Sequence, residues 1–360
     1  MTGLLPEGFH DRLPPFADAA ARLERGVLDA ARSYGYEQVD PPLAEFEDGL
    51  ARRLKAGGAR DAVRFTDPVS QKTLAIRPDI TAQVGRIAAT RMGHHPRPLR
   101  LSYAGPVLKL RASELRPARA MRQIGIELIG LDSVAAAREV VSVAVEALTA
   151  AGLTGLSIDF TLPDLVATLG GDAALAAALD AKDAGAVAAI DASYLPLIEA
   201  AGPFAAAIAR LRGHAALGSR LDALESIVAS LPAGVGLTLD PTERHGFEYQ
   251  SWLGFSIFAA GTLGEIGRGG TYKVLHDPIA EDGGKEEPAV GVSLYVDPIL
   301  DAAGRAVERR RLFLPFGTSA DDGARMRGEG WVTVAALEAQ DTPAAQLCTH
   351  VLLKGEVHEA

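Results

Sequence analysis

The chain has 360 residues, 48% of them hydrophobic and 23% charged, which excludes a disordered chain and leaves room for two or three domains. The formal net charge of −10 argues against a broad basic surface for nucleic-acid phosphates. A single cysteine, no leader-like N-terminus and no uninterrupted apolar stretch of ~18 residues argue against disulfides, secretion and a membrane span, so we expect a cytoplasmic location.

The N-terminal quarter predicts helices separated by extended segments. Residues 18–32 carry apolar side chains at helical spacing, and Asp18 is placed to cap this helix. Residues 38–43 are expected to be extended because they contain two prolines. A strand over 74–77 is expected to lead into a helix from Pro78 to about Arg91.

The next segment predicts a large antiparallel hairpin. Its strands are the strand-like runs 99–110 and 120–129, joined by a long loop. Residues 133–151 then form a good helix that ends at Gly152, and a short strand is expected over 156–160.

The composition changes at residue 161. Residues 161–232 are rich in alanine and leucine at helical spacing and predict a helical insertion between two halves of a β-rich domain. Strand patterns return at 234–239, 246–258 and 290–295.

The chain ends in a small α/β module with the order strand, helix, strand, strand. The expected domains are a β-rich domain of residues 1–160 and 233–305, the helical insertion 161–232, and the C-terminal module 306–360.

Three other features of the sequence bear on binding chemistry. Residues 267–270, Gly-Arg-Gly-Gly, lack a following G-K-[ST], so they predict a strand turn or close backbone packing and no phosphate loop. His94-His95 has no partner at metal-ligand spacing, so neither a metal nor a cofactor is expected. Arg116, Arg119 and Arg122 are either a solvated loop face or a contact to a partner.

Four segments carry a family resemblance. Residues 105–111 read Gly-Pro-Val-Leu-Lys-Leu-Arg, and 122–127 read Arg-Gln-Ile-Gly-Ile-Glu. Residues 74–82 read Leu-Ala-Ile-Arg-Pro-Asp-Ile-Thr-Ala, 36–45 contain a proline pair, and 246–249 read Gly-Phe-Glu-Tyr. They resemble motif 2, the "L-R-P-E-x-T-A" element, motif 1 and the start of the "R-G-x-D-Y" loop of class II aminoacyl-tRNA synthetases in their histidyl form.

This resemblance covers roughly residues 6–300 and implies the fold class. We expect an α+β, class II synthetase-like antiparallel sheet flanked by helices, with the helical insertion and the small C-terminal α/β module. Motif 1 is the dimer-forming element of that family, so the resemblance also implies a homodimer through residues 35–45.

The departures from the family concern the nucleotide end of the site. Lys109 stands where motif 2 has the arginine that grips ATP, Arg111 where it has a glutamate, and Pro298 where motif 3 has a second arginine. Lysine lacks the planar fork of arginine, and proline has no charge. Because electrostatic stabilisation is usually the largest part of such catalysis, we expect no catalytic residues. The C-terminal module is also shorter than the usual ~100-residue anticodon-binding domain, so no tRNA is expected.

The amino-acid end is better kept. By resemblance, positions that contact the amino group and side chain of histidine are occupied by Asp79, Thr81, Gln123 and Glu127. The expected histidine site is completed, at the motif 2 and loop positions, by Lys109, His245 and Tyr249. The family's second loop tyrosine falls on Gln250.

Structural alternatives remain open for each of these residues. Asp79 can serve as a helix cap, and Thr81 as an ordinary first-turn residue. Gln123 and Glu127 share one strand face, which can be a pocket wall or a solvated surface. The loop residues His245 and Tyr249 can be a surface histidine and a core tyrosine.

A damaged nucleotide site beside a kept amino-acid site resembles the regulatory subunits of ATP phosphoribosyltransferase, which are paralogues of histidyl-tRNA synthetase. The resemblance implies a non-catalytic chain in a hetero-oligomer. It would activate a short-form catalytic subunit and relay feedback inhibition by histidine, its allosteric ligand. The alternatives are an active histidyl-tRNA synthetase and a free-standing histidine-adenylating enzyme.

Overall fold

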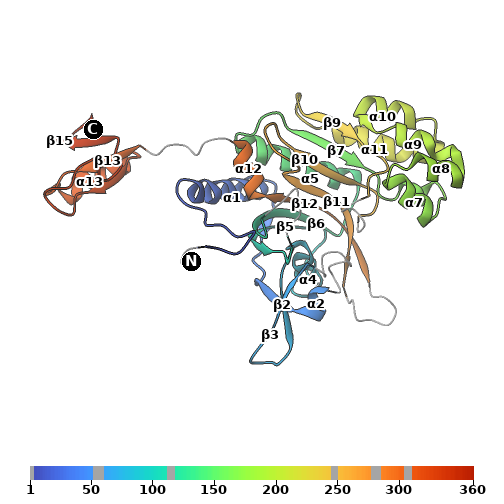
Figure 1. Ribbon diagram of the computed structural model, residues 1–360, viewed down its shortest axis with the longest axis horizontal. Helices are drawn as coiled ribbons and strands as arrows, with labels where there is room; N and C mark the ends of the chain where they lie inside the picture. Colours follow the sequence, from blue (N-terminus) through green and yellow to red (C-terminus); the bar gives the residue numbers. More distant parts are fainter. Residues whose placement is uncertain (1–3, 52–60, 112–117, 245–249, 277–284, 304–309) are drawn as a thin grey trace. The chain divides into compact units, whose positions relative to one another are not determined.

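The computed structural model describes residues 4–51, 61–111, 118–244, 250–276, 285–303 and 310–360. The chain divides into a larger unit, residues 1–304, and a smaller unit, residues 305–360. Each unit has its own sheet and its own apolar core (Figure 1).

The larger unit combines a long sheet, a small sheet and helices on both faces. Its first elements are α1 (Phe16–Ser33), β1 (Glu37–Gln38), β2 (Ala44–Phe46), α2 (Glu47–Ala51), β3 (Val63–Thr66), β4 (Thr73–Ile76), α4 (Thr81–Thr90), β5 (Leu99–Leu108), β6 (Ala120–Ile129), α5 (Val134–Ala150) and β7 (Ser157–Thr161). Its later elements are α6 (Leu165–Thr168), α7 (Ala173–Asp180), α8 (Ala184–Asp191), α9 (Leu195–Glu199), β8 (Gly202–Pro203), α10 (Phe204–Leu211), α11 (Gly218–Val228), β9 (Gly236–Leu239), β10 (Gly254–Phe258), β11 (Gly267–Leu275), β12 (Glu286–Tyr295) and α12 (Val296–Ala303).

Over the described residues, the long sheet has nine strands in the order β1-β5-β6-β12-β11-β10-β7-β9-β8. Its central pairings are antiparallel, as expected, but β1 pairs with β5 and β7 with β9 in parallel. The expected antiparallel sheet is thus confirmed for the central strands, and two parallel pairings nearer its ends make the whole sheet mixed. Parallel neighbours need a crossover connection, and the helices α6–α11 provide it between β7 and β9.

Helices cover both faces of the long sheet, and this arrangement creates the site. On one face, α1 and α5 pack with the aliphatic residues of β6 and β12 in the main core. On the other face, α4 packs with Tyr103, Ile129 and Tyr272 in a second core. Because side chains alternate along a strand, β6 and β12 contribute to both cores, and their residues Gln123, Glu127 and Ser293 lie on the α4 side.

The predicted N-terminal elements are largely confirmed. Helix α1 buries Leu23, Val27 and Leu28, as its apolar spacing predicted. The expected cap is wrong, because the helix begins at Phe16 and Asp18 lies in its first turn. A carboxylate in the first turn still stabilises the helix by its interaction with the helix dipole. The hairpin β5–β6 and helix α5 are confirmed, and the Ser133 hydroxyl caps α5 by accepting from the backbone N–H of Ala136 at 3.3 Å.

The glycine-rich stretch at 267–270 lies inside strand β11, which the sequence did not predict as a strand. The turn interpretation is wrong, but the close packing is confirmed. A Cβ on Gly269 would lie 2.4 Å from the Phe255 ring, and one on Gly270 would lie 2.3 Å from the backbone oxygen of Leu253. Only bare backbone fits between β10 and β12 here.

The helices between β7 and β9 gather at the β9 end of the sheet (Figure 1). Their buried residues, among them Leu179, Leu211 and Leu224, belong to the same core as the sheet. This segment therefore extends the main core and does not form a third compact unit.

The small sheet has the order β2-β4-β3 and two unlike faces. On one face Ala75 is buried against Leu50 and Ala62. The register places only apolar side chains on the opposite face, in two cross-strand rows: Ala44, Ile76 and Val63, then Phe46, Leu74 and Phe65. We call this the apolar face; Phe46 is 50% and Phe65 is 43% exposed on it.

In its described residues, 310–360, the smaller unit combines a four-stranded sheet, β14-β13-β15-β16, with helix α13. Its elements are β13 (Arg311–Leu314), α13 (Ala320–Gly328), β14 (Val332–Ala335), β15 (His350–Leu353) and β16 (Glu356–Glu359). Leu312, Leu314, Met326 and Leu352 form its core. The last strand was not predicted.

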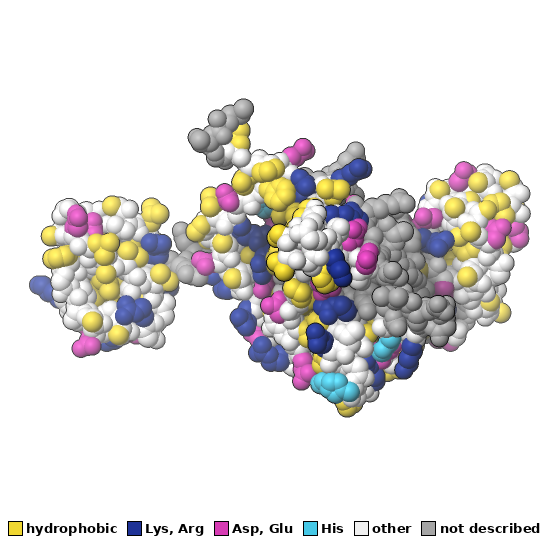
Figure 2. Space-filling view, turned by 90° about the horizontal axis from the view of Figure 1, so that it is seen from below, with side chains coloured by type: hydrophobic (Ala, Val, Ile, Leu, Met, Phe, Trp, Pro, Cys, Tyr) yellow, Lys and Arg dark blue, Asp and Glu magenta, His cyan; other side chains and the backbone are white. Residues whose placement is uncertain are grey.

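Two surface properties concern the choice of partners. Within the described residues, no helix is long and apolar enough to cross a membrane. Lysine and arginine side chains are interspersed with aspartate and glutamate over the described part of the face in Figure 2.

An ion-pair cluster joins the C-terminal end of α4 to β12. The Arg97 guanidinium pairs with Glu287 and also donates to the backbone oxygens of Ala88, Met92 and His95. Burial raises the pKa of Glu287, but hydrogen bonds from Arg97 and His276 outweigh it and hold the pKa below its usual value. The cluster therefore fixes α4 over the sheet by charge as well as by packing.

Replacing Arg97 with methionine should lower the free energy of unfolding by about 2–4 kcal/mol, because it leaves the mostly buried Glu287 without its main partner. Urea unfolding followed by circular dichroism measures this.

The matched control is Lys273→Met, which breaks the exposed Lys273–Glu286 pair between β11 and β12 and should leave the free energy of unfolding essentially unchanged, because water screens an exposed pair. Equal losses in the two variants would show that the Arg97 cluster has no special role.

Candidate functional site

The candidate site lies on the face of the long sheet that α4 covers. Gln123 and Glu127 of β6 point to this face, and each is only 1% exposed. The alternative of a solvated face is therefore wrong for both residues. Buried polar side chains need partners, and their partners define the site.

The carboxamide of Gln123 has hydrogen-bond partners on three sides. Its Oε1 accepts from the backbone N–H of Ile80 at 3.0 Å. Its Nε2 donates to Asp79 Oδ2 and to Ser293 Oγ, both at 2.7 Å. An amide nitrogen has only two hydrogens, so Gln123 has no further donor for a ligand. Its role in this structure is to support the site.

Asp79 acts at the start of α4, as the capping alternative predicted. Its Oδ1 accepts from the backbone N–H of Thr81 at 2.8 Å, while its Oδ2 is held by Gln123. The formal N-cap position is Ile80. Two of the helix N–H groups that lack intrahelical partners are thus satisfied by side chains, one from β6 and one from the preceding loop.

Tyr103 of β5 lies at the centre of the buried polar group. Its hydroxyl is 3.0 Å from Thr81 Oγ1, 3.0 Å from Ser293 Oγ and 3.1 Å from Glu127 Oε1. The ring crosses Gly125, where a Cβ would lie 2.2 Å from the hydroxyl oxygen. Glycine at this position of motif 2 is therefore a steric requirement of the site.

Glu127 is the buried acid of the site. Its Oε2 accepts from the Tyr272 hydroxyl at 2.8 Å, and a Cβ on Gly291 would lie 1.6 Å from the same oxygen. Burial raises the pKa of Glu127 to about 8, with hydroxyl hydrogen bonds partly opposing the rise and the Asp79 carboxylate adding to it. At neutral pH the empty site therefore holds Glu127 mainly protonated, and a cationic ligand group would favour its ionised form.

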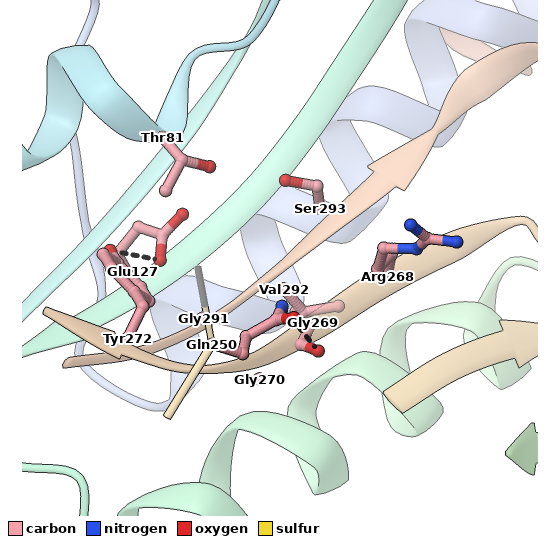
Figure 3. A pocket seen from close by; sticks show the side chains of 10 residues that line it. All are labelled: Thr81, Glu127, Gln250, Arg268, Gly269, Gly270, Tyr272, Gly291, Val292 and Ser293. Atoms are coloured by element: carbon pink, nitrogen blue, oxygen red, sulfur yellow. Dashed lines mark hydrogen bonds between the residues drawn. The ribbon is translucent and has the colours of Figure 1, made fainter. Parts of the chain in front are cut away.

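A pocket opens beside these residues. It encloses about 210 Å³, including space open to solvent, and Figure 3 shows the side chains around it. Its lining residues are Thr81, Glu127, Gln250, Arg268, Gly269, Gly270, Tyr272, Gly291, Val292 and Ser293. Of these, Arg268 is the cationic residue, and its Nε donates to Glu265 at 2.9 Å.

The structure brings four of the predicted residues together. Thr81 and Glu127 line the pocket, while Asp79 and Gln123 hold them in place from behind. Lys109 does not line the pocket: it follows the end of β5, four residues beyond the partner of Gln123 in the register, or ~13 Å along the strand.

His245 and Tyr249 lie outside the described residues. The sequence missed Tyr103, Tyr272, Ser293 and Arg268. An aromatic residue in a strand, such as Tyr103 or Tyr272, usually indicates core packing. Only the strand pairing, which places its ring near Glu127, would have identified it as part of the site.

The residues at the family's nucleotide-contact positions do not line the pocket. Pro298 lies in the first turn of α12, and the neighbouring Asp297 pairs with Arg12 from the N-terminal segment. Arg111 is exposed beyond the end of β5. Among the described residues, no group of three or more histidine, cysteine, aspartate or glutamate side chains could hold a metal ion.

Arg119 and Arg122 are not simply solvated. Arg119 donates to the backbone oxygen of Lys109 and lies over the Phe9 ring, and Arg122 pairs with Glu24. Arg116 lies outside the described residues.

Comparison with known proteins agrees with this architecture. Residues 8–299 match the family model described as histidyl-tRNA synthetase. A protein of Rhodospirillum centenum named ATP phosphoribosyltransferase regulatory subunit is 42% identical, with 99% of this chain and 96% of that protein covered. One of the same name from Paramagnetospirillum magneticum is 41% identical, covering 97% and 96%.

A solved structure shows the same fold. It is described as an ATP phosphoribosyltransferase regulatory subunit/histidyl-tRNA synthetase from Bacillus halodurans, and it superposes with a TM-score of 0.79 at 21% identity, covering 96% of each chain. The mixed sheet with its covering helices is thus the class II, histidyl-tRNA synthetase-like fold. The matched relatives and the family model together place the chain: it belongs to the family of ATP phosphoribosyltransferase regulatory subunits, which shares the histidyl-tRNA synthetase fold.

Proposed function

We propose that this chain activates a short-form ATP phosphoribosyltransferase catalytic subunit and relays to it feedback inhibition by histidine, in the first step of histidine biosynthesis. The observation that carries the proposal is the buried Glu127 carboxyl in a small polar pocket, in a chain whose relatives are named regulatory subunits of that enzyme. The chain itself is non-catalytic. We propose that it acts in the cytoplasm and does not bind tRNA.

We assign the pocket to histidine. Glu127 can accept from a ring N–H, and the Thr81 hydroxyl can accept from the ammonium group at the start of α4, where the Asp79 carboxylate behind it adds negative charge. A carboxylate needs a cation, and Arg268 lines the pocket whereas Lys109 does not. We include His245 and Tyr249 in the proposed site because of the family resemblance alone.

Histidine binding would reach the catalytic subunit through the elements that meet at the pocket. Glu127, Ser293 and Thr81 come from β6, β12 and α4, so a ligand that changes their spacing shifts three elements together. Coupling between two sites is typically about 1–3 kcal/mol, and by reciprocity the catalytic subunit must change histidine affinity by the same factor.

We also propose that the chain is a homodimer within the hetero-oligomer, through residues 35–45 and the apolar face. The proposal rests on the resemblance of 35–45 to motif 1 and on the exposed Phe46 and Phe65 beside it. Two aromatic rings exposed in one cross-strand row are costly in water and are stabilised when a second copy covers them.

Replacing Glu127 with glutamine should raise the histidine concentration needed for half-inhibition of the assembled complex by roughly tenfold or more. The reason is that a hydrogen bond to a charged group is lost while the shape is kept. The measurement is phosphoribosyl transfer by the catalytic subunit with this chain added, over a histidine titration.

Glu338→Gln, at an exposed position of the smaller unit, is the matched control and should leave inhibition unchanged. If both Glu127→Gln and Asp79→Ala complexes are inhibited like the wild type, histidine is sensed elsewhere and the pocket assignment fails.

The pH dependence of unfolding checks the charge state of Glu127. Because its folded pKa of about 8 lies above the unfolded value of 4.5, its contribution to stability is complete below pH 4.5 and is lost as the pH rises to 8. The free energy of unfolding of the wild type, relative to that of Glu127→Gln, should therefore fall by up to about 1.4 kcal/mol per pH unit across this range. Urea unfolding at pH 5, 6, 7 and 8 measures the difference, and parallel curves for the two proteins would contradict a buried, protonated glutamate.

The isolated chain should sediment as a dimer at micromolar concentration, and Phe46→Asp should shift it towards monomer, since a charge on the apolar face is desolvated in the dimer. Phe316→Asp, at an exposed residue of the smaller unit, controls for added charge. A wild-type monomer would refute the dimer, and a dimer unaffected by Phe46→Asp would remove the apolar face from it.

A further inference from the structure

Lys182, just after helix α7, has a backbone conformation that lysine rarely adopts. Its φ is 54°, in the left-handed region. Its N–H donates to the backbone oxygen of Leu179, and the N–H of Asp183 donates to that of Ala178, both at 3.0 Å. This pattern ends many helices, usually with glycine at the position that Lys182 occupies. A side chain there costs free energy, so a lysine is expected to make a compensating contact.

The compensating contact is with the turn that follows strand β9. The ammonium group of Lys182 donates to Asp240 Oδ1 at 2.6 Å and to the hydroxyl of Thr242. The same oxygen of Asp240 accepts from the backbone N–H of Thr242 at 3.1 Å, and Thr242 is 2% exposed. A residue of the helical insertion thus fixes the start of the connection from β9 to β10.

Two more contacts hold the rest of residues 240–244, which we call the clamped segment. Asp180, the last residue of α7, accepts from the backbone N–H of Arg244 at 2.6 Å. The Thr161 hydroxyl, at the end of β7, donates to the backbone oxygen of Glu243 at 2.5 Å. The clamped segment is therefore held by α7 on one side and by the long sheet on the other.

The lysine is also the counter-charge for two neighbouring carboxylates. Thr238 of β9 pairs with Asp159 of β7 and donates to its Oδ1 at 2.5 Å. Burial raises the pKa of Asp159, and the Asp240 carboxylate adds to the rise, while the Thr238 hydroxyl and Lys182 oppose it. Removing the lysine would leave the repulsion between the two carboxylates without this compensation.

The clamped segment leads along the chain to the pocket. The next described residue after Arg244 is Gln250, which lines the pocket, and His245 and Tyr249 of the proposed site stand between them in the sequence. Fixing one end of a chain segment reduces the number of its conformations, so less entropy is lost when a ligand orders the segment. The contacts of α7 can therefore act on ligand affinity without touching the ligand.

We propose that Lys182 is a positioning residue of the pocket. Together with Asp180 it holds the clamped segment in the conformation that binds the ligand, so that the helical insertion sets the affinity of the pocket for histidine. This inference rests on the proposed function, since it assigns to the insertion a part in the same regulation.

Calorimetric titration of the full chain with L-histidine tests the proposal. Lys182→Gly removes the ammonium group and also relieves the backbone conformation. It should weaken histidine binding by roughly five- to tenfold, because a smaller fraction of the chain is then ready to bind, without a matching loss of stability in urea. Lys182→Arg keeps a cationic donor and should bind within about threefold of the wild type.

Lys354→Gly is the matched control, because Lys354 is an exposed lysine of the β15–β16 turn with a φ of 52°. It should bind histidine like the wild type. Unchanged affinity in Lys182→Gly, or an equal loss in Lys182→Arg, overturns the inference. If Lys182→Gly does not fold, Asp240→Asn decides: it removes the charge that Lys182 contacts, and unchanged affinity in this variant overturns the inference.

The outcomes separate the inference from the proposed function. Histidine binding that is lost in Glu127→Gln but unaffected in Lys182→Gly keeps the function and removes the positioning role. A wild-type chain that does not bind histidine, alone or with the catalytic subunit, overturns both.

Discussion

The carboxamide of Gln123 holds the first turn of α4 against β6 and β12. Its oxygen takes the N–H of Ile80, and its nitrogen holds both Asp79 and Ser293. A helix start normally needs a capping side chain from its own segment, but here the partner comes from a strand 43 residues further along the chain. Because Gln123 is buried, this contact could not be lost without leaving several polar groups unpaired, so the position of α4 and the shape of the site are set together.

The glycines of the central strands follow from the same constraint. Tyr103 crosses Gly125 to reach Ser293 and Glu127, and Glu127 extends over Gly291 to reach Tyr272. Any side chain at either glycine would occupy the space of a buried hydrogen-bonding group. The polar network therefore depends on a sheet with bare backbone at chosen positions, which weakens the strands locally and is compensated by the two apolar cores around them.

Much of this could be predicted from the sequence, because hydrophobic periodicity and the spacing of Gln123 and Glu127 carry the information locally. Strand β11 could not, since Gly267, Gly269 and Gly270 remove the β-branched pattern by which strands are recognised. Likewise Tyr103, Tyr272 and Ser293 join the site only through the register of strands far apart in the chain. The supporting role of Gln123 could not be predicted either. A motif shows which residues come together, but not which of their donor and acceptor atoms are already hydrogen-bonded within the protein.

The site of histidyl-tRNA synthetase-like proteins has a nucleotide end and an amino-acid end, and in this chain the charged residues at the two ends have different partners. At the nucleotide end, Asp297 beside Pro298 is neutralised by Arg12, an ion pair within the chain where the family resemblance would have a cationic side chain turned to ATP. At the amino-acid end, the hydrogen-bond partners of Glu127 within the described residues are the hydroxyls of Tyr103 and Tyr272, and no arginine or lysine is among them. A buried carboxyl in such surroundings is stable when protonated and gains most from a ligand that brings a positive charge. If the proposed function holds, a cationic ligand would complete the charge balance of this site, which gives a physical basis for sensing it.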